Sequence, residues 1–312
     1  MIDYVKKQEF ALVFLCTEKT IRSCMNNFQH IINCMKPKEV FVICSAHTSS
    51  LISNEEKETI QIIDEDTLVE GMTFSSVKES IKEINPNGIK RTGWYFQQFL
   101  KLGFALKSED DLYLVWDSDT LPLKETCMFQ NDKMYFDVKE EFNVLYFDTI
   151  SKILPRLRKK ENYSFISEHM MFHSGYVRKM LEEISRDDVK DFWKVIIKNI
   201  PPKQLDQSGF SEFETYGTYM TQTFPDVYEI RKWKSLREGA LFFRDGLSVE
   251  KRDELSHYFD AISFEEHDVQ KKLTYILSNR FFQKIRFIRF FEGSKGIVKN
   301  IFVWIKIKKY VK

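Results

Sequence analysis

The chain has 312 residues, of which 43% are hydrophobic and 30% are charged, so it is long enough to bury a sizeable core in one large domain. Its net charge of +1 excludes the basic balance typical of a nucleic-acid-binding protein, and no run of about 18 apolar residues is present to span a membrane. Five cysteines without a CxxC pair predict free thiols in a reducing compartment, and therefore a cytoplasmic protein.

The first part of the chain alternates between continuous apolar runs and segments with helical spacing of apolar residues. Short links between such segments predict a parallel sheet of the α/β class. The second predicted helix follows Thr92, which we expect to be its N-cap. We predict strands at residues 10–16, 37–46, 58–68 and 112–116, and helices at residues 17–35 and 92–108.

Two aspartates, Asp117 and Asp119, follow the last of these strands directly in the segment YLVWDSDTLPL. Ligands of α/β proteins bind where strands end, and carboxylates two residues apart can converge on a hard cation such as Mg²⁺ or Mn²⁺. A cation held there would stabilise the negative charge of a departing diphosphate. The alternative is a polar turn that only ends the strand, with Pro122 helping to stop it.

Two classes of enzyme share this local sequence. In a haloacid-dehalogenase-like phosphatase, the segment VWDSDT would make Asp117 the phosphorylated nucleophile and Asp119 the acid/base. In a glycosyltransferase of the GT-A fold, the two aspartates would bind the metal of a nucleotide-sugar donor. Three predicted strands and two predicted helices precede the strand that leads to Asp117, which favours the glycosyltransferase because the phosphatase motif normally lies near the start of its domain.

Four segments in this order resemble a family of bacterial glycosyltransferases: KRTGWYFQQFLKLGFAL, YLVWDSDTLPL, ISEHMMF and GFSEFETYGTY. The resemblance implies an α/β chain with the GT-A (Rossmann-like) fold, a mixed central sheet flanked by helices. Residues 1–278 would form this domain, with residues 8–123 as the nucleotide-sugar-binding half and residues 124–278 as the acceptor half. It also implies transfer of a sugar, which we expect to be UDP-linked, to a saccharide during synthesis of a capsule, lipopolysaccharide or other surface polysaccharide. Asp117 and Asp119 would then hold Mn²⁺ or Mg²⁺.

Five residues are predicted donor contacts. The second predicted helix offers its N-terminal amides to anions, and the resemblance places this region near the nucleotide and the donor sugar. The alternative is a solvated basic flank of an ordinary amphipathic helix. The predicted contacts are Arg91 beside that N-terminus, Gln97 and Lys101 on one helix face, Ser118 between the aspartates, and Arg244 in LFFRDGL.

Two histidines and a tyrosine are predicted acceptor contacts, because the resemblance places their segments beside the acceptor. His169 is favoured over His173, since Glu168 and His169 interrupt an apolar run. Tyr216 is expected to stack on a sugar ring. The alternative for each histidine is a structural hydrogen bond.

The segment QSGFSEFETYGTYM holds Glu212 and Glu214 among aromatic residues. On a helix they would point about 200° apart, so only one could face a pocket. Such surroundings raise the pKa of a carboxyl group, which suits a general base that deprotonates the acceptor hydroxyl in an inverting reaction. We predict Glu212 as this base and Glu214 as an acceptor-side or structural partner. The alternative for Glu214 is a capping box with Ser211.

The end of the chain differs from the rest in charge. Residues 279–312 carry ten Lys and Arg but one acidic residue, a net charge of +9, so the preceding 278 residues carry −8. Phe, Ile and Trp recur at helical spacing between these basic residues. We predict a basic amphipathic helical extension on the anionic inner face of the cytoplasmic membrane, which suits a lipid-linked oligosaccharide acceptor. Alternatives are a helix pair packed on the domain, an oligomer contact, or a non-catalytic membrane-surface binding protein.

Overall fold

The computed structural model describes residues 9–130, 133–140, 143–237, 239–243 and 247–264. The chain divides into two compact units, one of residues 1–236 and 248–263 and one of residues 237–247 and 264–312. Helix α10 (Gly239–Phe242) belongs to the second unit, and all other elements named below belong to the first. Arg244 and the predicted extension at residues 279–312 lie outside the described residues.

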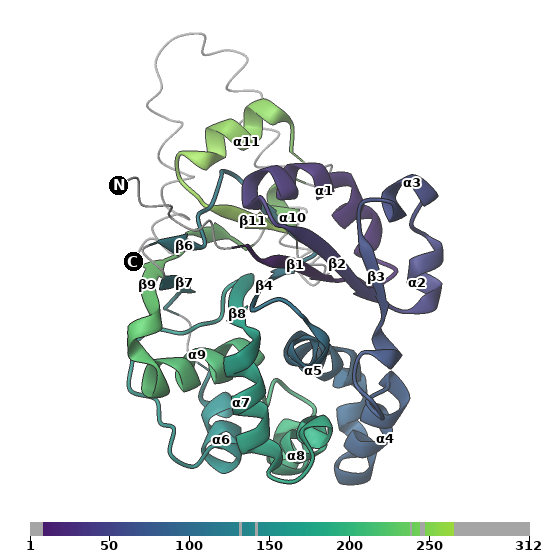
Figure 1. Ribbon diagram of the computed structural model, residues 1–312, viewed down its shortest axis with the longest axis vertical. Coiled ribbons are helices and arrows are strands. Elements are labelled where there is room, and N and C mark those ends of the chain that lie inside the picture. Colours follow the sequence, from purple (N-terminus) through teal and green to yellow (C-terminus); the bar gives the residue numbers. More distant parts are fainter. Residues whose placement is uncertain (1–8, 131–132, 141–142, 238, 244–246, 265–312) are drawn as a thin grey trace. The chain divides into compact units, whose positions relative to one another are not determined.

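A five-stranded mixed sheet forms the centre of the first unit (Figure 1), in the order β3-β2-β1-β4-β8. Strands β1 to β4 are parallel to their neighbours, and β8 is antiparallel to β4. Every residue of β1 is buried, as expected for a strand covered on both faces. The strands are β1 (Ala11–Leu15), β2 (Glu39–Cys44), β3 (Gln61–Asp64), β4 (Leu112–Asp117) and β8 (His169–His173).

Helices cover both faces of this sheet (Figure 1). Phe28 of α1 (Ile21–Met35) packs on Phe14 of β1, with ring centroids 6.3 Å apart. Phe104 of α5 (Thr92–Lys107) packs on Tyr113 of β4 at 5.0 Å. Because the register pairs Phe14 with Trp116, Tyr113 points to the opposite face, and α5 therefore lies on the side toward which Asp117 also points.

The remaining α-helices include α4, α7 and α9, which contact α5. They are α2 (Ala46–Ser50), α3 (Asn54–Lys57), α4 (Phe74–Ile84), α6 (Val144–Ile153), α7 (Ser174–Ser185), α8 (Phe192–Asn199), α9 (Glu212–Thr223) and α11 (Val249–Ser256). Short 3-10 helices span Glu65–Thr67, Pro86–Arg91, Val189–Asp191, Pro202–Gln204 and Pro225–Val227. No helix of the described residues is both long and apolar enough to cross a membrane.

Two small sheets bring later segments of the chain to the end of β4. One has the order β10-β11-β5 and the other β6-β7-β9. Strand β5 comes directly after the turn that carries the aspartates, and β7 contacts β8. Their bounds are β5 (Thr120–Pro122), β6 (Phe129–Gln130), β7 (Lys133–Val138), β9 (Tyr228–Lys232), β10 (Ser235–Leu236) and β11 (Ala261–Ser263).

The predicted α/β class with a mixed central sheet between helices is confirmed. The predicted N-cap of α5 is wrong, because the 3-10 helix Pro86–Arg91 runs directly into α5 and Arg91 occupies the cap position. Thr92 is buried, and its hydroxyl donates a hydrogen bond to the carbonyl of Ile89. The anion-binding helix N-terminus expected there is therefore not formed.

Candidate functional site

The two aspartates emerge where the strand order of the central sheet reverses. From β1, strands β2 and β3 follow on one side, whereas β4 and β8 follow on the other. In open α/β sheets, ligands bind outside the carboxyl ends of the strands at such a switch point. Leu15, the last residue of β1, is paired with Asp117, the last residue of β4, and Asp119 lies in the turn that follows.

Two hydrogen bonds fix the turn from Asp117 to Thr120. The backbone N–H of Asp117 donates to the carbonyl of Glu168 at 2.9 Å, and the indole N–H of Trp116 donates to the carbonyl of Thr120 at 2.8 Å. Asp117 and Asp119 are partly exposed, whereas Trp116 is fully buried. The turn therefore presents two carboxylates to solvent on a buried aromatic support.

A buried lysine lies against the first of these carboxylates. The Nζ of Lys101, on α5, is 2.9 Å from Asp117 Oδ1 and 2.9 Å from Glu212 Oε1. Burial alone would lower the pKa of the Lys101 ammonium, but the two carboxylates raise it above its ordinary value, so Lys101 stays charged. We call Lys101, Asp117 and Glu212 the Lys101 cluster. Its two ion pairs connect α5 to β4 and to α9.

Glu212 is the first residue of α9 and is 1% exposed. Its Oε1 bonds to Lys101, whereas its buried Oε2 has no hydrogen-bond partner among the described residues. Burial raises the pKa of the Glu212 carboxyl group, and Lys101 opposes that rise. The cluster thus contains one buried carboxylate oxygen that is free to accept a hydrogen bond or a proton.

Glu214 points away from the cluster, as the helical spacing of the two glutamates predicts. Its carboxylate accepts hydrogen bonds from the Ser164 hydroxyl at 2.6 Å, the Phe165 N–H at 3.0 Å and the Lys159 ammonium at 3.0 Å. Ser211 is the N-cap of α9 and accepts from the Glu214 N–H at 3.3 Å. The capping box is not completed, because the Glu214 side chain ties α9 to residues 159–165 instead.

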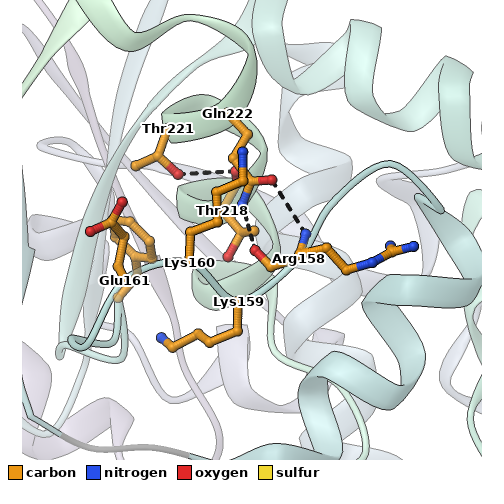
Figure 2. Close-up of a pocket in the computed structure, with 8 residues that line it drawn as sticks. Arg158, Lys159, Lys160, Glu161, Thr218, Thr221 and Gln222 are labelled. Carbon is orange, nitrogen blue, oxygen red and sulfur yellow. Dashed lines mark hydrogen bonds between the residues drawn. The ribbon is translucent and has the colours of Figure 1, made fainter.

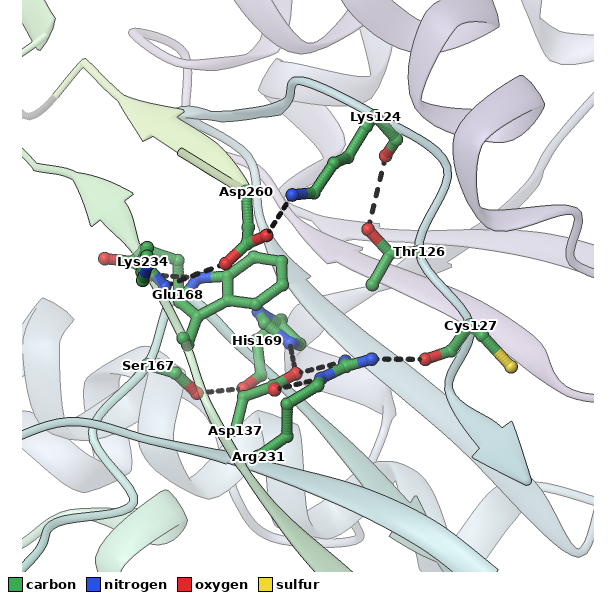
Figure 3. Close-up of polar contacts among 11 residues, drawn as sticks. Lys124, Thr126, Cys127, Asp137, Ser167, Glu168, His169, Arg231, Lys234 and Asp260 are labelled. Atoms are coloured by element: carbon green, nitrogen blue, oxygen red, sulfur yellow. Dashed lines mark hydrogen bonds and ion pairs between the residues drawn. The ribbon is translucent and has the colours of Figure 1, made fainter. Parts of the chain in front are cut away.

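His169 lies beneath the aspartate turn and is 2% exposed. Its ring stacks on Trp116 with centroids 4.7 Å apart, and Trp233 meets it edge-on at 4.5 Å. Figure 3 shows its Nε2 pointing to Asp137, 2.7 Å from Oδ2, and Arg231 binding the same carboxylate through two nitrogens at 2.6 and 2.7 Å. This burial and the bond to Asp137 favour the alternative for His169, a structural hydrogen bond.

The other two predicted acceptor contacts have structural partners. His173 is the N-cap of α7, and its Nδ1 accepts from the Gly175 N–H at 3.1 Å. Tyr216 is fully buried, and its hydroxyl accepts from the His173 N–H at 3.0 Å. The Tyr216 ring has no face open to solvent on which a sugar could stack in this structure.

The predicted donor contacts separate into two groups. Arg91 donates to the carbonyl of Gln207 at 2.9 Å and the hydroxyl of Ser208 at 2.8 Å, so two of its nitrogens clamp that loop. Gln97 and Ser118 are partly exposed. Gln97 lies one helical turn before Lys101 on the same face of α5, and Ser118 lies between the two aspartates.

A second buried charge network lies next to the site, and the sequence does not predict it. The Glu168 carboxylate binds the Lys139 ammonium, the Trp233 indole N–H at 3.1 Å and the Ser235 hydroxyl at 2.8 Å. Together with Asp137 it fixes the small sheets against the start of β8. Two signs in the sequence were an aspartate inside the apolar run MYFDV and the interruption of another apolar run by Glu168 and His169.

A shallow hollow lies elsewhere, between residues 158–161 and α9 (Figure 2). Its volume of about 10 Å³ is close to that of a single water. Its polar groups bond to one another, since the Gln222 amide donates to the carbonyl of Arg158 at 2.6 Å and accepts from its N–H at 3.3 Å. The hollow is too small for a sugar.

The described residues contain no group of three or more His, Cys, Asp or Glu side chains that could hold a metal ion. Asp117 and Asp119 supply two hard oxygen ligands. With all carboxylates ionised, these two residues, Glu212 and Lys101 carry a net charge of −2. This donor set and charge fit a divalent cation that completes its shell with phosphate oxygens and water.

Comparisons with known proteins give one family and several distant structures. A sequence model of a protein family described as "Family of unknown function (DUF6492)" matches residues 19–272. A search of curated proteins gives no match.

Among solved structures, mouse xyloside xylosyltransferase 1 in its apo form is 10% identical, with a TM-score of 0.42 over 83% of this chain and 98% of that chain. The galactosyltransferase LgtC, in complex with donor and acceptor sugar analogs, is 11% identical, with a TM-score of 0.41 over 82% and 87%. The apo glycosyltransferase GlyE of Streptococcus pneumoniae TIGR4 is 11% identical, with a TM-score of 0.39 over 89% and 64%. Likenesses this distant say nothing about the substrate or the reaction.

Proposed function

The chain belongs to DUF6492, a family of unknown function, and we propose that it is a metal-dependent glycosyltransferase that moves a sugar from a nucleotide-sugar donor to a saccharide acceptor. The observation that carries the proposal is the place of Asp117 and Asp119, two accessible carboxylates at the switch point of a mixed α/β sheet. Carboxylates placed there suit a divalent cation that binds phosphate oxygens. The four segments that resemble GT-A glycosyltransferases support the same function.

The metal would be Mn²⁺ or Mg²⁺, held by Asp119 and by the Asp117 oxygen that does not bond to Lys101. Asp119 would be the main ligand in this proposal, and Asp117 would contribute only the oxygen that Lys101 leaves. When bound, the metal would offset the negative charge on the departing diphosphate.

The protein's own side chains have separate roles in this account. Lys101 holds Asp117 in one orientation and offsets one negative charge of the site. Gln97 and Ser118 would contact the donor, since both are partly exposed beside the Lys101 cluster. In an inverting reaction, Glu212 Oε2 would take the proton of the acceptor hydroxyl. The burial of that oxygen requires substrate binding to open a path to it.

The donor nucleotide, the polysaccharide pathway and the membrane attachment are inferred from the sequence. The resemblance to surface-polysaccharide enzymes supports a UDP-linked donor and a role in capsule or lipopolysaccharide synthesis. The net charge of +9 in residues 279–312 supports attachment to an anionic membrane surface, and with it a lipid-linked acceptor.

The experiment is donor hydrolysis measured over a panel of nucleotide sugars, with and without Mn²⁺. Hydrolysis of one donor that needs Mn²⁺ and is lost in Asp119→Ala would support the proposal. The control is Asp226→Ala, which removes an exposed aspartate from the 3-10 helix Pro225–Val227. If no donor is hydrolysed but p-nitrophenyl phosphate is, the protein is instead a phosphatase with Asp117 as nucleophile.

A further inference from the structure

We propose that Trp116, His169 and Asp137 form a positioning device for the turn that carries Asp117 and Asp119. His169 is then a positioning residue that acts through Trp116, and it does not touch substrate. The inference rests on the proposed function, because it assigns these three residues to the support of the carboxylates that would hold the metal.

Trp116 is the first part of the device, because its indole closes the aspartate turn. Its N–H donates to the carbonyl of Thr120 at 2.8 Å, and both groups are buried. The Thr120 hydroxyl is in turn hydrogen-bonded to the Ser263 hydroxyl at 2.8 Å. One side chain therefore links the residue before Asp117 to the residue after Asp119, and a shift of the indole would move both ends of the turn.

His169 is the second part, because it fixes the indole plane. The two rings stack at 4.7 Å with an interplanar angle of 25°, and Trp233 packs edge-on against both rings. The residue before β8 adds a backbone tie at the same point, where the carbonyl of Glu168 accepts from the Asp117 N–H. The imidazole is therefore held against the underside of the turn by stacking and by its own strand.

Asp137 is the third part, because it sets the rotation of the imidazole within its plane (Figure 3). Its Oδ2 is 2.7 Å from His169 Nε2, and Arg231 binds both of its oxygens. Arg231 also donates to the carbonyl of Cys127 at 2.8 Å, which ties the pair to the backbone. A carboxylate likewise orients the imidazole of metal-ligating histidines, whereas here the oriented imidazole stacks on Trp116.

Packing alone does not explain a histidine at this position. His169 Nδ1 is buried without a hydrogen-bond partner among the described residues, which costs folding free energy. A phenylalanine would fill nearly the same space without that cost, but it could not bond to Asp137. What the histidine adds over a phenylalanine is one fixed ring orientation against Trp116.

The test uses His169→Phe, which keeps the stacking and removes the bond to Asp137, and Trp116→Phe, which removes the bond to Thr120. The matched control is His257→Phe, the same substitution at an exposed histidine that follows α11. Two quantities are measured on the full chain. One is hydrogen–deuterium exchange of peptides covering residues 112–123. The other is the affinity for a nucleoside diphosphate with Mn²⁺, using whichever of UDP, GDP, CDP and ADP binds the wild type most tightly.

We expect faster exchange at residues 112–123 in both variants, because the turn is no longer held in one geometry. The affinity should then fall by roughly tenfold, comparable to the loss of an outer-shell partner of a metal ligand. The control should change neither quantity. Unchanged exchange at residues 112–123 in both variants overturns the inference. So does unchanged affinity in both variants when Asp119→Asn abolishes binding, because the stack then serves packing alone. If the wild type binds none of the four nucleotides with Mn²⁺, the proposed function fails and the inference falls with it.

Discussion

The ammonium of Lys101 lies 2.9 Å from the carboxylate of Asp117. Lys101 is a buried residue of α5, whereas Asp117 is the last residue of β4, at the edge of the sheet. This pair joins the interior of the protein to the surface at the point where the strand order reverses. Because Lys101 also binds Glu212, the orientation of Asp117 depends on a residue from α9.

Replacing Lys101 by Met should destabilise the protein strongly. The substitution leaves Glu212 buried without its counter-charge, and breaking a buried ion pair in this way costs about 3–5 kcal/mol. The double variant Lys101→Met with Glu212→Gln should recover part of that loss, because no buried charge is then left unpaired. Urea unfolding measures both. A loss below about 1 kcal/mol in the single variant would show that the pair is not buried in solution.

The two glutamates of α9 should have separable effects. Glu214→Gln weakens the tie to Ser164, Phe165 and Lys159, and hydrogen bonds to a charged group are worth about 1.5–3 kcal/mol each. We expect lower stability and unchanged donor affinity. Glu212→Gln should instead lower kcat with a smaller change in stability. Unfolding curves and donor kinetics of both variants check this. Loss of turnover in Glu214→Gln at unchanged stability would reverse the assignment.

The cap of α7 should make stability depend on pH. Burial lowers the pKa of the His173 imidazole from its ordinary 6.5. The folded protein therefore favours the neutral form, whose Nδ1 can accept from the Gly175 N–H. Protonation favours the unfolded state, so this contribution is complete above about pH 6.5 and is lost as pH falls from there through the lowered pKa.

The measurement is the unfolding free energy of wild type and His173→Asn between pH 7.5 and 5. Asparagine caps a helix at any pH, so wild type should lose stability relative to the variant as pH falls. A difference that stays constant over this range would contradict the prediction.

Two glycine-to-alanine substitutions should have opposite effects on stability. A Cβ at Gly217, in α9, would lie 2.2 Å from Phe165, and overpacking of a core typically costs about 1–3 kcal/mol. A Cβ at Gly93, in α5, would meet nothing closer than 3.9 Å, and replacing a helical glycine by alanine stabilises by roughly 0.5–1 kcal/mol. Thermal unfolding of both variants checks the sign. Equal effects would contradict the packing of α9 on residues 159–165.

The sequence predicts the central strands well and the small sheets poorly, for a physical reason. Strand β1 is buried on both faces, so it is a continuous apolar run that stands out in the sequence. Strands β7 (Lys133–Val138) and β9 (Tyr228–Lys232) carry Asp137 and Arg231, which look like surface residues. Only the fold shows that these two side chains pair with each other and with His169.

In the candidate site, too, the sequence predicts local geometry but not contacts between distant segments. Helical spacing predicts that Glu212 and Glu214 face opposite ways, because this follows from local geometry. Their partners come from distant segments, so the sequence could not predict that Lys101 binds both Glu212 and Asp117. Arg91, expected at a donor, instead binds a loop more than a hundred residues away, and local spacing cannot predict such a contact.

The most direct test of the central claim is nucleotide binding by isothermal titration, with and without Mn²⁺, to wild type, Asp119→Asn and the control Asp226→Asn. If Asp117 and Asp119 hold a metal against a diphosphate, wild type and control should bind one nucleoside diphosphate only with Mn²⁺, and Asp119→Asn should bind at least roughly 100-fold more weakly. Equal, metal-dependent binding by all three proteins would contradict the account, because the metal would then lie elsewhere. Absence of nucleotide binding in all three would contradict the proposed function itself.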